Sequence, residues 1–376
     1  MTKLLEVFKQ IEVKPVRGEG VWLYAEDGAR YLDFYGGHAV ALLGNSHPRL
    51  TETVSRQAQT LVFVSNLVPL AVRERAAERL IAFGPKGLDR VFFVNSGAEA
   101  NENALRIAFR ATGRKRVVCV AGSFHGRTAA ASAITAGHEK WYAFPAEPFP
   151  VDVVPFDDDD ALARVVGPDT AAVIFEPVQG VGGARALSPG FVSRAREITR
   201  KAGAVLIFDE VQCGMGRSGQ PFAAQAYGVT PDLLTTAKGL AGGFPVGAVL
   251  VSDALSKVVK PGDLGTTFGG GPLACALVET VIDTIEREQL LPRVRRLSAR
   301  LAAETRVGPV TDVQGMGFLL GLRTRTPAKD VLTALRQQHH ILAGDSADPN
   351  IVRLLPPLVL EDAHVDALVA ALKELK

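Results

Sequence analysis

Two charged side chains, Asp209 and Lys238, follow apolar segments in the middle of this 376-residue chain. The apolar run 204–208 before Asp209 is typical of a strand buried on both faces of a parallel sheet. A carboxylate at the end of such a strand lies where open α/β sheets bind ligands. Lys238 follows the apolar segment 231–237, and a lysine withdrawn from water has a lowered pKa and can attack carbonyl groups. Taken alone, either residue could equally be an ordinary exposed charge.

A run of small residues after an upstream strand predicts an anion site. The predicted strand 89–94 is followed directly by Asn-Ser-Gly-Ala-Glu-Ala-Asn-Glu at 95–102. The small residues of this stretch would therefore expose several backbone N–H groups at the start of a helix, where the helix dipole also favours phosphate. The stretch lacks the Lys-Ser/Thr of a P-loop and the spacing of dinucleotide sites. An N-capped helix without a ligand remains the alternative.

Two further segments supply groups that a phosphorylated ring cofactor needs. Residues 122–128, Gly-Ser-Phe-His-Gly-Arg-Thr, contain an aromatic ring, an imidazole and a guanidinium, and residues 265–271 contain hydroxyls on a glycine-rich backbone. Together with the phosphate site, the carboxylate and the lysine, they match pyridoxal 5'-phosphate (PLP). The aldehyde of PLP bonds to a lysine, and its ring nitrogen needs an anionic partner.

The elements that must position these residues alternate between strand and helix. This alternation predicts an α/β fold, with a mostly parallel sheet covered by helices on both faces. The strands are expected at 89–94, 116–121, 171–175 and 204–208, and the helices at 98–111 and 190–202. A helix start is also expected at the acidic run 157–160, because Asp favours the first turn.

The two ends of the chain follow different patterns. Residues 20–35 predict a hairpin around a two-residue Asp27-Gly28 turn, and two helical segments follow between 48 and 83, divided by Pro69. After Pro272, helices alternate with short strands. The helices are expected near 273–291, from there to about 304, near 327–339 and near 361–375, and the short strands near 310–322 and 351–355. We therefore expect three parts: an N-terminal segment 1–45 packing with the small domain, a large PLP-binding domain 46–272, and a small C-terminal α/β domain 273–376.

Composition excludes several classes of partner. The 42 basic and 40 acidic side chains nearly balance, so nucleic acid is not expected as a partner. No apolar run reaches the roughly 18 residues that a membrane helix needs, and the charged N-terminus does not resemble a signal peptide. The three cysteines have neither metal nor disulfide spacing, so we expect no metal site and a cytoplasmic protein.

Over nearly its full length the chain resembles the class III (ω-amino) aminotransferases of PLP fold type I. Within that class it is most similar to the acylornithine aminotransferases of arginine biosynthesis, with the carrier-protein-linked enzymes of the lysine pathway close behind. The resemblance rests on seven motifs in family order: NSGAEANE at 95–102, SFHGRT at 123–128, EPVQG at 176–180, FDEVQCGMGRSG at 208–219, AKGLAGGFPVGA at 237–248, TTFGG at 266–270 and RLLPPL at 353–358.

The resemblance implies a role for each matched residue. Lys238 would be the Schiff-base lysine and proton shuttle, and Asp209 would pair with the pyridinium nitrogen. Gln212 would reach the phenolic oxygen, Phe124 would stack on the ring, and Thr267 would complete the phosphate site of the neighbouring subunit in a homodimer with shared active sites. The full set of cofactor-binding residues is Ser96, Gly97, Ala98, Phe124, Asp209, Val211, Gln212, Lys238 and Thr267. Arg127, beside Thr266, would bind the donor's α-carboxylate, and Arg353 that of glutamate.

Three departures from the family pattern concern substrate choice. The family usually has a glutamate where this chain has Val181, and an asparagine where it has Gly271. The family glutamate pairs with the second arginine while an ω-amine is bound, so we expect Arg353 to be open, hydrated or held by some other group. His38 lies where the family has a variable apolar or tyrosine residue near the substrate. A substrate contact and a hydrogen-bonded loop residue are both open for it.

The expected reaction is transamination of an N-acylornithine with 2-oxoglutarate, giving the semialdehyde and glutamate. The alternatives are another ω-aminotransferase, acting on ornithine or 4-aminobutyrate, an aminomutase of the glutamate-1-semialdehyde type, and a non-catalytic PLP-binding protein. The acyl group stays open between acetyl, succinyl and a carrier-protein amide. An acidic amino-group carrier protein is an expected partner only in the lysine-pathway case.

Overall fold

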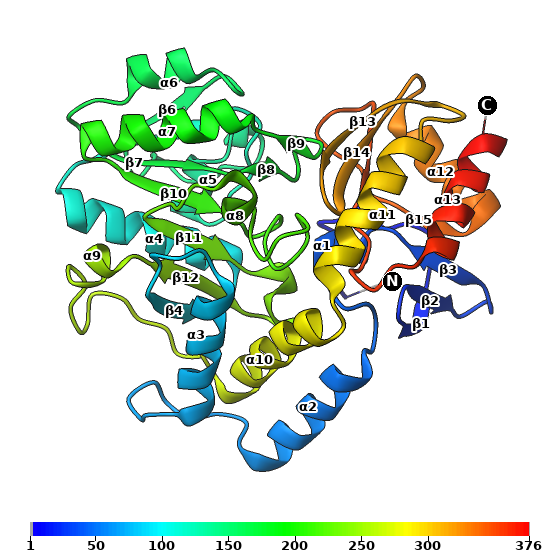
Figure 1. The fold of residues 1–376 in the computed structure, drawn as a ribbon, viewed down its shortest axis with the longest axis horizontal. Coiled ribbons are helices and arrows are strands. Elements are labelled where there is room, and N and C mark those ends of the chain that lie inside the picture. The colour runs from blue at the N-terminus through cyan, green and yellow to red at the C-terminus, as the bar shows by residue number, and fades with distance from the viewer. Residues whose placement is uncertain (1–2, 376) are drawn as a thin grey trace.

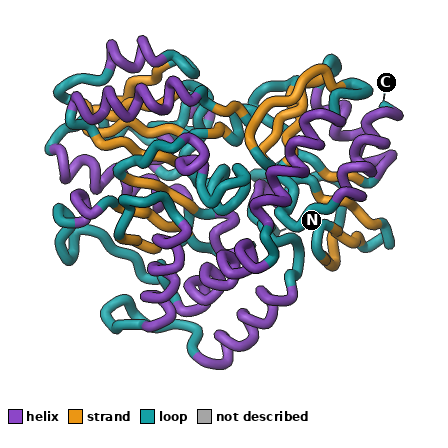
Figure 2. Tube along the Cα trace, in the orientation of Figure 1, coloured by secondary structure: helices purple, strands orange, loops and turns teal. Residues whose placement is uncertain are grey.

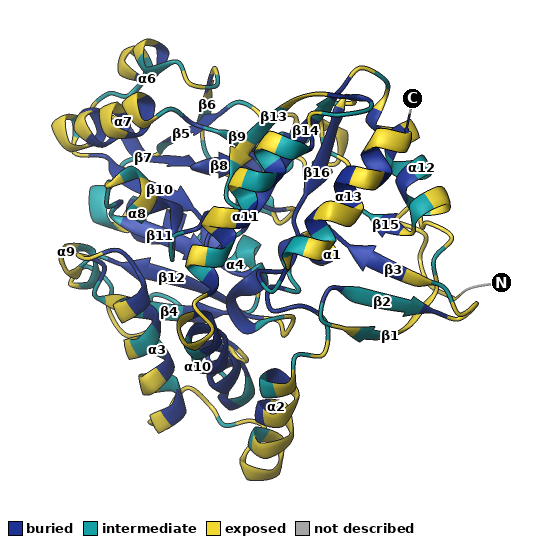
Figure 3. Ribbon diagram, turned by 45° about the vertical axis from the view of Figure 1, so that its right-hand side comes forward, coloured by how far each residue is buried: buried dark blue, intermediate teal, exposed yellow. Residues whose placement is uncertain are grey.

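A seven-stranded sheet is the largest element of the computed structural model, which describes residues 3–375 (Figure 1). Its strand order is β4-β12-β11-β10-β7-β5-β6. The strands are β4 (Arg90–Val94), β5 (Arg116–Val120), β6 (Val151–Val154), β7 (Thr170–Phe175), β10 (Val205–Asp209), β11 (Leu233–Thr236) and β12 (Gly247–Val251). The central strands β7, β10 and β11 are buried at every position (Figure 3), which explains the apolar runs 171–175 in β7 and 205–208 in β10.

Helices cover both faces of this sheet, as predicted. Side chains alternate across a strand, and in β10 Val205 and Ile207 join one apolar cluster while Leu206 and Phe208 join another. The first cluster contains the buried face of α4 (Gly97–Thr112), and the second contains that of α7 (Pro189–Ala202). The layered arrangement is visible in Figure 2. The predicted helix start in the acidic run is α6 (Asp159–Val165), capped by the Asp158 carboxylate, which accepts from Ala161 N.

The sheet is mixed rather than wholly parallel, because β12 runs antiparallel to both β11 and β4. The sequence analysis did not predict β6, β11 or β12 as strands. None of the three shows the isolated apolar run that marked the predicted strands: Asp152 interrupts β6, two threonines end β11, and β12 directly follows the glycine-rich segment 239–246. The mostly parallel α/β fold is nevertheless confirmed, since the pairs among β11, β10, β7, β5 and β6 are all parallel.

The predicted hairpin near the N-terminus is present, but its turn is longer than expected. Strands β2 (Trp22–Ala25) and β3 (Arg30–Asp33) pair antiparallel, and Ala25 N donates to Ala29 O across the loop. Three residues, 26–28, therefore form the loop, so the two-residue turn was wrong. Gly28 takes up the extra residue at φ +84°, as in three-residue hairpin loops with a left-handed last position. β1 (Pro15–Glu19) pairs with β2, and β15 (Ile341–Leu342) pairs with β3 in parallel.

The C-terminal part contains helices and a three-stranded sheet of β13 (Val310–Met316), β14 (Leu319–Thr324) and β16 (Ile351–Leu354). The helices are α10 (Pro272–Arg287), α11 (Leu290–Glu304), α12 (Ala328–His339) and α13 (Asp362–Glu374). Helix α10 packs against α2 (Pro48–Thr60) and α3 (Ala71–Phe83), and the Thr53 and Thr280 hydroxyls lie 2.8 Å apart. The domain division at 45 and 272 stays a prediction. Within residues 3–375, no helix is both long and apolar enough to cross a membrane.

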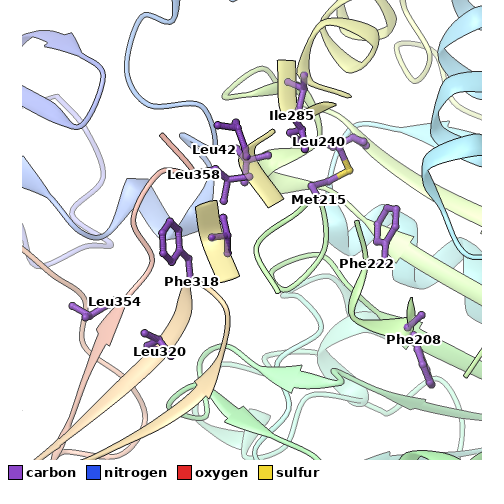
Figure 4. Close-up of a cluster of buried hydrophobic side chains, with 14 of the residues drawn as sticks. Leu42, Phe208, Met215, Phe222, Leu240, Ile285, Phe318, Leu320, Leu354 and Leu358 are labelled. Atoms are coloured by element: carbon purple, nitrogen blue, oxygen red, sulfur yellow. The ribbon is translucent and has the colours of Figure 1, made fainter. Parts of the chain in front are cut away.

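A buried arginine connects the segment that follows β10 to the C-terminal part of the chain. Arg217 has no exposed surface and donates through Nη1 to the carbonyls of Phe318 and Pro356. Burial lowers the pKa of its guanidinium to about 9, and the charge of Asp33 opposes that shift. Buried apolar side chains from distant parts of the sequence pack in the same region, among them Leu42, Met215, Phe318 and Leu358 (Figure 4).

Candidate active site

The carboxylate of Asp209, at the carboxyl end of β10, is held in place by three groups. Its Oδ2 accepts from Asn101 Nδ2 at 2.7 Å and lies 2.7 Å from His125 Nδ1, and its Oδ1 accepts from Val211 N at 3.0 Å. The Asp209 residue is only 2% exposed. Asn101 is positioned in turn by the Thr235 hydroxyl, which donates to its Oδ1 at 2.6 Å. A buried anion is thus fixed at the sheet edge where a ligand is expected.

His125 is a member of this network that the sequence analysis left without a role. Because the Asp209 carboxylate only accepts, Nδ1 carries the hydrogen and donates to it. The other ring nitrogen, Nε2, is buried and has no partner among the described residues. The available signal was position alone, directly after Phe124 at a strand end.

Lys238 lies where the chain leaves β11 and keeps part of its surface open. Its backbone φ is +42°, a left-handed conformation that costs energy in a non-glycine residue and is often found at functional sites. Burial lowers the pKa of its amine, while the charges of Asp209 and Glu176 oppose that shift. Within residues 3–375, no group forms a hydrogen bond or ion pair with its Nζ. The amine is therefore available to a ligand.

These residues border one cavity of about 450 Å³. Its lining includes Ser96, Gly97, Ala98, Phe124, Arg127, Asp209, Val211 and Lys238. At Gly97, an added Cβ would lie 2.8 Å from Val211 Cγ1, so only glycine lets the start of α4 approach this wall. The structure thus brings together most of the predicted cofactor-binding residues, from four different strand ends.

Ser96 and Glu99 organise the predicted phosphate end of the cavity. Ser96 is the N-cap of α4, and its Oγ accepts from Glu99 N at 3.2 Å. The Glu99 carboxylate accepts from Asn95 N at 2.7 Å. The backbone N–H groups of Gly97 and Ala98 belong to the first turn of α4, where helix N–H groups lack intrahelical partners.

Two predicted residues, Thr266 and Thr267, do not border the cavity in this chain. Thr266 Oγ1 accepts from Gly269 N at 3.1 Å and from Asn95 Nδ2 at 3.3 Å. Thr267 is exposed, and its neighbour Phe268 is 68% exposed and packs against Phe63 with ring centroids 5.6 Å apart.

Glu176 is a second buried acid beside this site, and it holds the loop that carries Phe124. Its Oε1 accepts from Phe124 N and its Oε2 from Gly180 N, both at 2.8 Å. Burial, together with the charge of Asp209, raises the pKa of Glu176 to about 7. The sequence analysis placed Glu176 at a strand end but gave it no role.

Arg127 borders the cavity and is exposed. Its guanidinium carbon lies 5.3 Å from the ring centroid of Trp141, a cation–π arrangement that restrains the side chain without using its N–H donors. Among the residues that the structure describes, none accepts a hydrogen bond from it. Its fork of donors is therefore free to bind a carboxylate.

Arg353, on β16, is buried, with 3% of its surface exposed. Its Nη2 donates to the Tyr35 hydroxyl at 3.2 Å, its Nη1 to Gln212 Oε1 at 3.4 Å, and its Nε to the Asp345 carbonyl. The resemblance predicts that Arg353 is open, hydrated or held by some other group, and in the structure it is held by other groups. Gln212 is turned toward Arg353, and neither residue borders the 450 Å³ cavity.

His38 is part of the same cluster as Arg353. Its Nδ1 lies 2.5 Å from the Tyr35 hydroxyl. Burial lowers the pKa of His38, and the positive charges of Arg353 and Lys238 lower it further. His38 is therefore a hydrogen-bonded loop residue in this structure. Tyr35, the link between His38 and Arg353, had no role in the sequence analysis.

These features fit PLP by the chemistry of the donor set. An amine without a partner, a buried carboxylate, the first turn of a helix and an aromatic ring border a single cavity. Each corresponds to one group of the cofactor: the aldehyde, the ring nitrogen, the phosphate and the ring face. Among the described residues, no cluster of His, Cys, Asp and Glu could hold a metal ion.

Comparison with known proteins gives a consistent picture. The family model described as "Aminotransferase class-III" matches residues 7–375. The acetylornithine aminotransferase of Streptomyces coelicolor is 46% identical over 362 residues, covering 95% of this chain and 89% of that protein. That of Mesorhizobium japonicum is 42% identical over 374 residues, covering 96% and 93%.

Solved structures of two related enzymes are also similar. The ornithine aminotransferase of Toxoplasma gondii superposes with a TM-score of 0.91 at 29% identity, covering 99% of this chain and 92% of that one. The acetylornithine aminotransferase of Elizabethkingia anophelis has a TM-score of 0.84 at 28% identity, covering 98% and 95%.

Proposed function

Because this chain belongs to the class-III aminotransferase family, whose members depend on PLP, we propose that it transfers the ω-amino group of an N-acylornithine to 2-oxoglutarate. The products are the semialdehyde and glutamate, as in arginine biosynthesis. Relatives named acetylornithine aminotransferase, at 36% to 46% identity, support this donor. The observation that carries the proposal is the shared cavity, which places an unpartnered lysine amine, a buried carboxylate and a free guanidinium together.

PLP, when bound, supplies the conjugated ring that withdraws electrons from the substrate carbon bearing the amino group. Asp209 keeps a proton on the ring nitrogen, because Asn101 and His125 hold its carboxylate in one orientation. Lys238 Nζ would take the proton from the substrate carbon that bears the amino group and would return it to the aldehyde carbon of the cofactor. Its lowered pKa keeps more of the amine neutral and able to accept that proton.

Backbone and side-chain groups around the cavity orient the cofactor. The N–H groups of Gly97 and Ala98, beside Ser96, bind the phosphate at the start of α4. Phe124, which lines the cavity, would stack on the ring, and Val211 forms the wall beside Gly97. Gln212, whose Oε1 already accepts from Arg353, offers its Nε2 donors to the phenolic oxygen.

Two arginines bind the carboxylates of the two substrates. Arg127 binds the α-carboxylate of the acylornithine, and its exposed position leaves room for the long donor. Arg353 binds the α-carboxylate of glutamate and 2-oxoglutarate. The fork geometry of arginine suits both contacts.

The protein acts as a homodimer in which Thr267 completes the partner's phosphate site. Support comes from the exposure of Thr267 and Phe268 and from the exposed apolar neighbours Val62, Phe63 and Leu67, because apolar patches of this kind mark protein contacts. We place the enzyme in the cytoplasm, where its three buried free cysteines stay reduced.

Ornithine is the second candidate donor, on the strength of the structural likeness to an ornithine aminotransferase. A screen of half-reactions tests both. The absorbance of the purified holoenzyme is followed as acetylornithine, succinylornithine, ornithine, lysine and 4-aminobutyrate are added in turn. We expect an N-acylornithine to convert the cofactor fastest and 2-oxoglutarate to restore the starting spectrum. If ornithine or 4-aminobutyrate converts the cofactor fastest, an N-acylornithine is not the donor. If 2-oxoglutarate does not restore the starting spectrum, the enzyme is an aminomutase instead. Poor conversion of free N-acylornithines would leave a carrier-protein amide as the donor.

A further inference from the structure

Arg353 is a buried cation without a buried anion to match it. Its three hydrogen bonds go to a phenol, an amide oxygen and a backbone carbonyl. In the described part of the chain it makes no ion pair with a carboxylate. A buried guanidinium held only by neutral oxygens is incompletely stabilised, so an arriving carboxylate would gain more here than at an exposed arginine.

The Tyr35 hydroxyl links Arg353 to His38 in one direction. It accepts from Arg353 Nη2 at 3.2 Å and therefore turns its own hydrogen toward His38 Nδ1, at 2.5 Å. His38 must be neutral to accept that hydrogen, and its lowered pKa favours the neutral ring. Burial also raises the pKa of Tyr35, so its hydroxyl remains protonated.

The backbone holds this pair in place at some cost. The segment Gly36–Ala39, labelled α1 in Figure 1, has φ between +55° and +70° at all four residues. His38 and Ala39 are strained there. The Asp33 carboxylate holds the segment by accepting from Tyr35 N and Gly36 N, both at 2.8 Å. The position of Tyr35 is therefore specified by the fold.

The ring of Tyr35 is also tied to the strand that carries Arg353. An added Cβ at Gly344 would lie 1.9 Å from Tyr35 Cε2, so only glycine leaves room for the ring. Gly344 exchanges both backbone hydrogen bonds with Arg353, at 2.7 and 2.9 Å. Phenol and guanidinium are thus held against each other from both sides.

We propose that Tyr35 is the exchangeable, uncharged ligand of Arg353. Its hydroxyl occupies Nη2 while the ω-amine donor, which has no carboxylate at that end, reacts. It gives way when the carboxylate of the second substrate binds, and His38 then holds the displaced hydroxyl. This assignment rests on the proposed function for the identity of the two substrates. Tyr35 acts through Arg353 and is a positioning residue.

The test separates binding from turnover by using glutarate, a dicarboxylate with neither an amino nor a keto group. Calorimetric titration of the holoenzyme measures its Kd. In Tyr35→Phe the carboxylate no longer competes with a hydroxyl, so we expect glutarate to bind about three- to tenfold more tightly. The KM of the amine donor should rise by a similar factor, because Nη2 then has no ligand in that half-reaction. An unchanged or weaker glutarate Kd would overturn the proposal, as would equal changes in both KM values.

A double-mutant cycle tests whether Tyr35 acts through the arginine. Arg353→Lys should abolish most glutarate binding, and Tyr35→Phe should then have no further effect in that background. Retained binding in Arg353→Lys would place the anion elsewhere. Tyr24→Phe, which removes a hydroxyl from β2, is the matched control and should change neither constant.

His38→Asn tests the same link from its other end if Tyr35→Phe loses the cofactor absorbance. Asn tolerates the left-handed backbone at this position, but it is too short to reach the hydroxyl. The hydroxyl is then free to donate to the incoming carboxylate, and glutarate should again bind more tightly. Unchanged binding would overturn the proposal. Failure of the proposed function looks different, because no amine would change the wild-type spectrum while the glutarate titration would still report on Arg353.

Discussion

The two buried charges of the site are stabilised in opposite ways. At the end of β10, the Asp209 carboxylate accepts from Asn101 and Val211 and lies against His125 Nδ1. On β16, the Arg353 guanidinium donates to three oxygens of which none belongs to an anion in the described chain. The first charge has a complete set of partners that nothing needs to replace. The second has only neutral partners, of which we propose that Tyr35 is replaced by a substrate carboxylate.

This difference separates chemistry from substrate choice. A group that acts in both half-reactions needs one fixed geometry, and the sheet edge with α4 provides it. A group that must meet two substrate ends needs a ligand that can leave, and we propose that Tyr35, next to the strained segment 36–39, is that ligand. Substitutions on the Asp209 side should therefore lower the rates of both half-reactions, whereas substitutions on the Arg353 side should change the ratio of the two rates.

The largest effect is expected at Lys238, on the fixed side. In Lys238→Ala, PLP should still bind through phosphate and ring contacts, but turnover should fall by roughly 10⁴-fold because no group moves the proton. Wild-type protein should be yellow, and borohydride should attach the cofactor to Lys238, as peptide mapping can verify. Lys257→Ala, which removes an exposed lysine paired with Asp253, is the control. Normal steady-state turnover in Lys238→Ala would disprove the assignment.

Asp209→Asn should have the second-largest effect on turnover. The amide no longer holds a proton on the ring nitrogen, so removal of the substrate proton should slow by roughly 10²-fold in both half-reactions while the fold is kept. Loss of solvent exchange at that carbon measures the step directly. A loss of less than about tenfold, or ~1.4 kcal/mol of barrier, would mean that another group, with His125 the nearest, holds the nitrogen.

Arg127→Lys should act on only one substrate. It keeps the charge but loses the bidentate fork, which contributes about 1.5–3 kcal/mol in charge-assisted pairs. The KM for the acylornithine should therefore rise more than that for 4-aminobutyrate, which has no α-carboxylate. Arg110→Lys, an exposed change on α4, serves as the control. Equal losses for both amines would show that Arg127 is structural.

Val181→Glu gives the smallest expected effect and the closest test of the Arg353 side. The Val181 carbonyl accepts from Ala347 N at 2.9 Å, in the loop whose Asp345 carbonyl binds Arg353 Nε. A glutamate there would compete with Tyr35. It should lower the KM for the acylornithine and raise the KM for 2-oxoglutarate, each by roughly fivefold, which corresponds to about 1 kcal/mol of binding free energy. Stopped-flow measurement separates the two half-reactions. No change in either, or a faster 2-oxoglutarate step, would mean that the neutral ligands of Arg353 already suffice.

The fixed side of the site could be predicted because its signals are local. Asp209 ends a buried run, Gly97 opens a helix, and Lys238 follows an apolar segment, so a few neighbouring residues suffice in each case. Seven such segments in family order also identified the family. Strands β6 and β11 were missed because their local signal is broken, by Asp152 in β6 and by two threonines in β11.

The Arg353 side could not be predicted because its contacts are distant in sequence. Tyr35 and Arg353 are 318 positions apart, and no periodicity relates them. The turn of Gln212 toward Arg353 and the place of His125 beside Asp209 likewise depend on packing. The role of Thr267 depends on a second subunit, and the roles of both Thr266 and Thr267 stay predictions.

The pairing of β3 with β15 has a consequence for how the protein is made. Synthesis proceeds from the N-terminus, so β3 waits for a partner that is made some 300 residues later. Until then one edge of a sheet is exposed on the nascent chain, and such edges invite wrong pairing. The seven-stranded sheet, complete at Val251, can form earlier. The segment 36–39, which lies just after β3, is therefore among the first parts translated and the last to reach its final place.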